Sequence, residues 1–69
     1  MKFSRDDLFE VGEQLMLDGA ELYLRRGGDR IALGHLEYSS GWRLATWHGI
    51  VPIEKYDTLE VVGDAESSV

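Results

Sequence analysis

The sequence predicts an α+β protein in which an N-terminal amphipathic helix packs on a curled antiparallel sheet of three to four strands. Apolar residues recur with a period of about 3.6 residues in the first part of the chain, and with a period of two after Gly19. Glycine-rich turns separate the later apolar segments. The chain has 69 residues, so we expect a single domain over residues 1–63, followed by a frayed polar tail over residues 64–69.

The helix is predicted over residues 5–17. Ser4 and Asp7 have the spacing of a capping box, and Gly19 can adopt the left-handed conformation that ends a helix. Gly12 lies in the middle of the apolar face, although glycine costs about 1 kcal/mol of helix propensity relative to alanine. We therefore expect a close approach to a sheet at Gly12. The other members of the apolar face are Leu8, Phe9, Val11, Leu15 and Met16.

Strands are predicted over residues 20–26, 30–38, 42–48 and 58–62, with turns at residues 27–29 and 39–41. In the first of these strands Leu22 and Leu24 share a face. In the second strand the apolar phase changes at Gly34, which indicates a β-bulge or a sharp bend. Residues 50–53 contain Pro52 and are interpreted as an edge piece or a connector.

Composition excludes several classes of function. Thirteen acidic and seven basic residues give a net charge of −6, which disfavours autonomous binding to DNA or to anionic lipid. The chain has no cysteine and only two histidines, so we expect no disulfide, metal or cofactor. The longest apolar run has three residues, which predicts a cytoplasmic protein without a membrane span or a signal peptide.

The chain contains the residue types of a hydrolase, but they lack the context of a nucleophile elbow. So short a chain also leaves little room for a pocket of ~300 Å³. We therefore interpret the serines as turn residues and the histidines as strand residues, and expect no enzymatic activity and no catalytic residue. The residues considered are Asp29, His35, Ser39, Ser40, His48 and Asp57.

Two sets of residues are candidates for binding a protein partner. Asp6, Glu10 and Glu13 form an acidic stripe on the helix, which is either a solvated face or a surface that docks on a basic groove. The second set consists of residues that often anchor interfaces, namely Tyr38, Arg43 and Trp47. Trp42 and Trp47 face opposite sides of a regular strand. Trp42 shares the predicted core face with Leu44, while Trp47 shares the more polar face with Arg43 and is either exposed or a partly covered core residue.

Two segments, residues 23–28 (YLRRGG) and 31–36 (IALGHL), follow a helix and resemble the Sm/Hfq-like family. The resemblance implies a small barrel within an RNA-binding ring. The spacing from Gly28 to Gly34 is longer than in that family, and no counterpart of its second RNA-contacting motif lies near residues 47–49. We therefore transfer no functional residue, and keep Arg25, Arg26 and Arg30 as alternative contacts for RNA or a small ligand.

The leading expectation is a small acidic interaction module that binds a larger protein and inhibits or otherwise modulates it. In size and charge the chain is similar to phage- and mobile-element-encoded inhibitors of nucleic-acid-handling machinery. Because so small a core is marginally stable, we also expect a homodimer or an obligate complex, with edge-strand pairing as the simplest route to a dimer. The alternatives are an Sm/SH3-like small barrel that binds RNA or a small ligand, and a structural subunit of a larger assembly.

Overall fold

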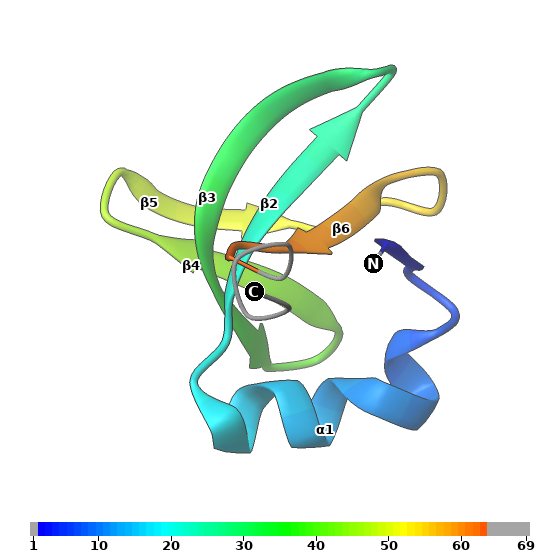
Figure 1. Ribbon diagram of the computed structural model, residues 1–69, viewed down its shortest axis with the longest axis vertical. Helices are drawn as coiled ribbons and strands as arrows, with labels where there is room; N and C mark the ends of the chain where they lie inside the picture. Colours follow the sequence, from blue (N-terminus) through cyan, green and yellow to red (C-terminus); the bar gives the residue numbers. More distant parts are fainter. Residues whose placement is uncertain (1, 64–69) are drawn as a thin grey trace.

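The computed structural model describes residues 2–63, and these form one helix and a six-stranded antiparallel sheet that is not closed into a barrel (Figure 1). The predicted α+β class is confirmed, but the sheet has more strands than the three to four expected. The predicted tail, residues 64–69, lies outside the described residues. The sheet order is β1-β6-β2-β3-β4-β5. The elements are β1 (Lys2–Ser4), α1 (Leu8–Asp18), β2 (Glu21–Arg26), β3 (Asp29–Tyr38), β4 (Trp42–Thr46), β5 (Gly49–Pro52) and β6 (Thr58–Val61).

The predicted capping box joins β1 to α1. The main-chain N–H of Ser4 donates to the Asp7 carboxylate at 2.8 Å, and the N–H of Asp7 donates to the Ser4 hydroxyl at 3.3 Å. Residues 5–7 form a turn, so α1 begins at Leu8 rather than at residue 5. Gly19 ends the helix with φ 66°, as predicted, and its N–H donates to the Met16 carbonyl at 3.1 Å.

The long strand β3 belongs to both halves of the sheet. Residues 29–35 pair with β2, and residues 35–38 pair with β4. Gly34 lies where the two pairings meet, and a Cβ atom there would lie 2.8 Å from the carbonyl carbon of Ala45 and 3.1 Å from Cα of Thr46. Glycine is therefore needed because the main chain of β4 lies directly against this position. Figure 1 shows β3 as a strongly curved strand.

The apolar residues of β3 change face as predicted, with Leu33 outward and Leu36 in the core, but the β-bulge offered as one explanation is not at Gly34. Ala32 and Leu36 both contact the core and Gly34 between them is buried, so one alternation runs through residues 32–36. Leu33 points to the other face and is 38% exposed. The register of the β2–β3 pairing shifts between Leu24 and Arg25 of β2, which is away from Gly34.

The second half of the sheet also differs from the prediction. The strand expected over residues 42–48 ends at Thr46, because Trp47 and His48 form a hairpin turn. Gly49 begins β5 instead of ending a strand, and β5 is an edge strand that ends at Pro52. Strand β1 pairs with β6 and was not predicted, because three residues are too few to show a period.

The core lies between α1 and the inner face of the curved sheet. Leu22 and Leu24 are both fully buried, which confirms the predicted inward face of β2. Phe9 is 75% exposed, so its assignment to the packed face of α1 is wrong. The buried apolar residues are Leu8, Leu22, Leu24, Leu36, Leu44, Ile53 and Leu59.

A bidentate ion pair attaches the end of β2 to the loop before β6. Arg26 Nε and Nη2 donate to the two carboxylate oxygens of Asp57 at 2.9 and 2.8 Å. The Asp57 side chain is 2% exposed and also accepts the main-chain N–H of Glu54 at 2.8 Å. The hydrogen bonds from Arg26 lower the pKa of Asp57 below its ordinary value of 3.8, although burial acts in the opposite direction.

We expect Gly34→Ala to destabilise the fold by at least about 1–3 kcal/mol, since the added methyl group meets main-chain atoms that have no rotamer to change. Urea unfolding followed by circular dichroism measures the effect. Leu33→Ala, at the neighbouring outward position, is the matched control and should cost much less. An unchanged midpoint for Gly34→Ala contradicts the close approach of β4.

We expect the fold to lose stability as the pH falls below about 3.8, because the lowered pKa of Asp57 makes its carboxylate stabilising above that value. The contribution is lost as the pH falls through the pKa that Asp57 has in the folded chain. Asp57→Asn should therefore be less stable than wild type near neutral pH, with a smaller difference in acid. Urea midpoints measured across this range test the sign, and a difference that grows in acid contradicts it.

Candidate functional site

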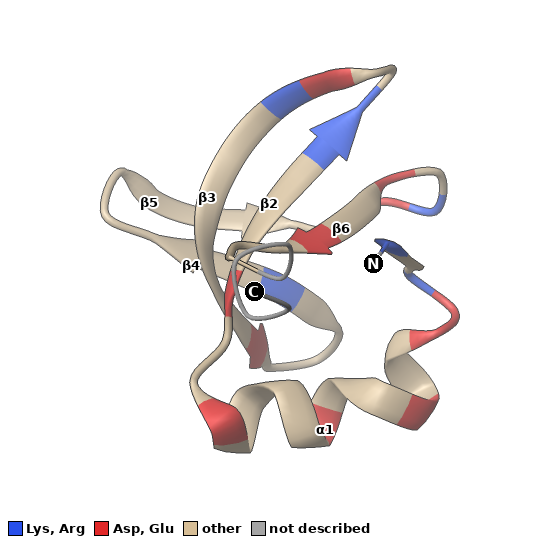
Figure 2. Ribbon diagram, viewed as in Figure 1, with Lys and Arg blue, Asp and Glu red and all other residues tan. Residues whose placement is uncertain are grey.

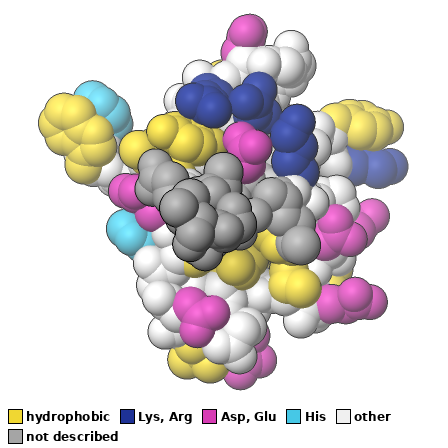
Figure 3. All heavy atoms as spheres, in the orientation of Figure 1, with side chains coloured by type: hydrophobic (Ala, Val, Ile, Leu, Met, Phe, Trp, Pro, Cys, Tyr) yellow, Lys and Arg dark blue, Asp and Glu magenta, His cyan; other side chains and the backbone are white. Residues whose placement is uncertain are grey.

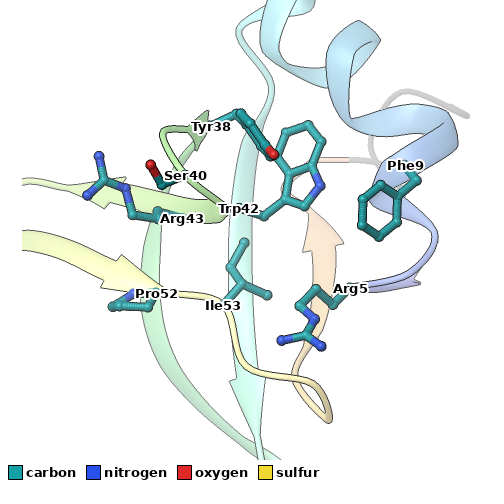
Figure 4. A pocket seen from close by; sticks show the side chains of 9 residues that line it. Arg5, Phe9, Tyr38, Ser40, Trp42, Arg43, Pro52 and Ile53 are labelled. Carbon is teal, nitrogen blue, oxygen red and sulfur yellow. The ribbon is translucent and has the colours of Figure 1, made fainter.

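An open cleft lies between α1 and the end of the sheet where β3 turns into β4. Phe9, Tyr38 and Trp42 line its two adjoining hollows, of about 380 and 470 Å³, and are called here the aromatic cleft. Tyr38 and Trp42 are cross-strand partners whose ring centres lie 4.9 Å apart at an interplanar angle of 71°. Phe9 approaches from α1 (Figure 4). With Phe9 75% and Tyr38 56% exposed, both rings are accessible to a partner.

Trp42 forms the base of the cleft and lies against the helix at Gly12. A Cβ atom at Gly12 would lie 2.7 Å from Cζ2 of Trp42, so the helix main chain rests on the indole ring. The predicted close approach at Gly12 is confirmed, but it is made to a side chain rather than to sheet backbone. The indole N–H is buried and has no hydrogen-bond partner among the described residues, and Figure 4 shows it on the side of the ring toward Phe9.

The two hollows of the cleft carry different charges. Arg5 lines the first hollow, beside Pro52 and Ile53, and Glu13 lines the second. Arg43 also lines the first hollow, but its Nη2 lies 2.7 Å from a carboxylate oxygen of Glu37. The guanidinium of Arg43 points away from Trp42 in Figure 4. The acidic second hollow therefore adjoins the acidic surface of α1, and the first hollow has Arg5 at its border.

Part of the predicted partner surface comes together at this cleft. Tyr38 and Glu13 line the same hollow. Glu10 is exposed on α1 and Asp6 is exposed in the turn before it, so the acidic stripe extends from the cleft along the helix (Figure 2). Phe9 was missed as a site residue because its apolar character assigned it to the core. Phe9 lies at the edge of the apolar face of the predicted helix, and this position could have indicated that its ring is exposed.

Trp47 lies apart from the acidic stripe. It is 88% exposed in the turn between β4 and β5, and its ring centre lies 3.9 Å from that of His48. This turn projects from the sheet away from α1 in Figure 1. The geometry therefore favours Tyr38 over Trp47 as the aromatic residue of a contact that includes the acidic stripe.

The three arginines near the β2–β3 turn all have carboxylate partners. Arg25 and Arg30 lie 3.5 and 3.9 Å from the same oxygen of Glu60, and Arg26 is held by Asp57. Arg30 also lies over the ring of Tyr23, 4.2 Å from its centroid. Arg25 Nε and Glu60 Oε1 have no hydrogen-bond partner among the described residues, so of the three only Arg26 is held by a hydrogen-bonded ion pair. A phosphate would have to compete with Asp57 for Arg26, which does not favour Arg26 as an RNA contact.

The hydrolase residue types are not gathered at one place. Asp57 is paired with Arg26, while His48 lies in the β4–β5 turn and Ser40 borders the first hollow of the cleft. Across residues 2–63, no three histidine or acidic side chains are grouped as metal ligands. No helix in that part of the chain is long and apolar enough to cross a membrane.

No protein-family model matches the chain, and no curated protein or solved structure is significantly similar to it. The Sm/Hfq-like resemblance of two short segments therefore stays an interpretation of the sequence. The function has to be argued from the residues and their geometry.

We expect Gly12→Ala to displace the Trp42 indole and so to deform the cleft. Alanine gains about 1 kcal/mol of helix propensity, but overpacking costs about 1–3 kcal/mol, so the variant should be less stable or near neutral. In a Trp47→Phe background, the remaining indole resonance and fluorescence report Trp42 alone. Trp42→Phe removes the part of the indole that contacts Gly12. In a Trp42→Phe background, Gly12→Ala should therefore increase stability by the difference in helix propensity between alanine and glycine. Additive effects in this cycle contradict the contact.

Proposed function

We propose that this chain is a small acidic interaction module that binds a larger protein through the aromatic cleft and modulates that protein by occupying a site on it. The observation that carries the proposal is the pair of exposed rings, Phe9 and Tyr38, on the borders of a cleft whose base is Trp42. Aromatic side chains that become buried on binding provide much of the energy of protein interfaces. Covering these rings would therefore give a partner its anchor.

The charge of the chain supports a basic partner. Glu13 lines the cleft, and Glu10 and Asp6 continue an exposed acidic surface beside it. The net charge of −6 attracts cationic surfaces over a distance and orients them before contact. The segment that fits best carries an aromatic or leucine side chain for the cleft and lysine or arginine residues opposite α1.

The indole N–H of Trp42, which has no hydrogen-bond partner within residues 2–63, gives a reason for a main-chain contact as well. A buried donor without a partner costs about 1–3 kcal/mol. A bound segment whose carbonyl oxygen reached this N–H, with movement of the exposed Phe9 ring, would recover that cost. The cleft then combines an apolar anchor, a charged border and one hydrogen bond that orients the segment.

We infer the class of target from the net charge and the small size of this chain. A basic groove of a nucleic-acid-handling protein is a surface that an acidic helix can occupy in place of phosphate. Inhibition by such blockade is the mode of action that we infer, by analogy in size and charge with inhibitors encoded by phages and mobile elements. Both inferences, that binding inhibits the target and that the chain is encoded by a phage or mobile element, rest on this analogy.

Selection of a random peptide library on the immobilised chain tests the proposal. We expect enrichment of sequences that combine lysine or arginine with one aromatic or leucine residue. In NMR titrations of the enriched peptides, the resonances of Phe9, Tyr38 and Trp42 should shift. Tyr38→Ser should weaken binding by about tenfold or more, whereas Leu17→Ser, at an exposed apolar position of α1 that does not line the cleft, should not.

Charge reversal separates the acidic stripe from a merely solvated face. Glu10→Lys combined with Glu13→Lys should slow association with the enriched peptides, and added salt should weaken wild-type binding. Enrichment of acidic or uncharged peptides, or shifts confined to residues outside the cleft, contradicts the proposal. The sheet is not closed into the small barrel that the sequence offered as an alternative, but RNA binding can still be tested. If the wild-type chain retains labelled RNA and the Arg25→Ala and Arg26→Ala variants do not, the RNA-binding alternative is favoured.

A further inference from the structure

Part of the outward surface of the sheet, over β5 and the adjoining parts of β4 and β3, has no formal charge when histidine is neutral, and the exposed Glu21 of β2, which pairs with His35, lies at its border. We call this uncharged part the neutral face and define it by Leu33, His35, Ala45, Trp47 and Ile50. His35 pairs with Ala45, and Ala45 pairs with Ile50, so these residues form a row across β3, β4 and β5. Residues 44–53, which make up most of β4 and all of β5, are the longest stretch of the sequence without a charged residue.

The neutral face leaves large apolar side chains in water. Leu33 is 38%, Ile50 47% and Trp47 88% exposed. Figure 3 shows hydrophobic and histidine side chains together where the β4–β5 turn lies in Figure 1. A contiguous exposed apolar surface of this kind is typical of an interaction site.

The same surface ends at an open edge of the sheet. Strand β5 is last in the strand order, so among the described residues no strand covers its outer side. Edge strands are templates for pairing with another chain. Because β5 is short and ends at Pro52, its main chain offers few hydrogen bonds, and burial of Trp47 and Ile50 has to supply most of the interaction energy.

We propose that the neutral face binds a second copy of this chain, related by a two-fold axis with the two β5 edges side by side. Each copy carries a net charge of −6, so a contact through the charged surfaces would bring like charges together. The neutral face avoids that repulsion, and two-fold symmetry makes one apolar patch sufficient for both copies. Trp47 and Ile50 of each copy pack on the same residues of the other, beside the two β5 edges.

This dimer goes beyond the proposed function and leaves the aromatic cleft open. The β4–β5 turn and α1 project from different parts of the fold (Figure 1). A dimer therefore presents two clefts at once, which would strengthen binding to a partner that has two basic segments. The stability of the dimer does not depend on whether the cleft binds anything.

Sedimentation velocity from low micromolar to millimolar concentration tests the dimer. The 7.8 kDa chain should shift toward twice that mass as the concentration rises, and no further. Ile50→Lys should weaken self-association by about tenfold or more, because each copy places one cation in the apolar contact. Trp47→Ser should weaken it too. The matched control is Tyr56→Ser, which removes an aromatic ring 86% exposed in the loop before β6 and should leave the dimer unchanged.

Salt gives an independent readout. Added salt screens the repulsion between two −6 chains and should strengthen the dimer, whereas it should weaken binding of a basic segment at the cleft. The two proposals can therefore fail separately. A wild-type chain that stays at 7.8 kDa throughout, a mass that rises beyond two copies, or a dimer insensitive to both Ile50→Lys and Trp47→Ser overturns the inference.

Discussion

The main chain of β4 passes so close to β3 that a side chain cannot be accommodated at Gly34. This contact lets β3 pair with β2 along most of its length and with β4 at its end. The end of β3 is thereby carried toward the helix, where Tyr38 and Trp42 meet across the strands. The aromatic cleft is thus a consequence of where the sheet bends, and Gly12 is the second close contact that completes it.

Charge is distributed unevenly between the sheet and the helix. The arginines of β2, β3 and β4 all lie close to carboxylates of β3, of the loop before β6 or of β6 itself. Among the described residues, none of these ion pairs engages an acidic side chain of α1. The arginines of the sheet thus lie beside carboxylates, whereas the acidic residues of α1, coloured in Figure 2, are exposed. This asymmetry is the physical basis for proposing a basic partner.

The core is small, and the exposed aromatic residues lie outside it. Seven buried apolar side chains hold the sheet and the helix together, and a chain of this length has little stability to spare. Phe9, Tyr38 and Trp47 nevertheless remain largely in solvent. They fall on two separate surfaces, one beside α1 and one on the neutral face, so a protein partner and a second copy would not compete for the same residues.

The sequence by itself determined the helix with its capping box and Gly19 terminus, the turn after β2 and the inward face of Leu22 and Leu24, because each depends on residues close together in the chain. It also pointed to Tyr38 and the acidic stripe as candidate contacts. Only the tertiary structure decided that β1 pairs with β6, that Phe9 borders a cleft, and that the arginines of the β2–β3 hairpin are paired with distant carboxylates. Those features arise between segments far apart in the chain, and local periodicity carries no information about which distant segment comes to lie beside a given residue.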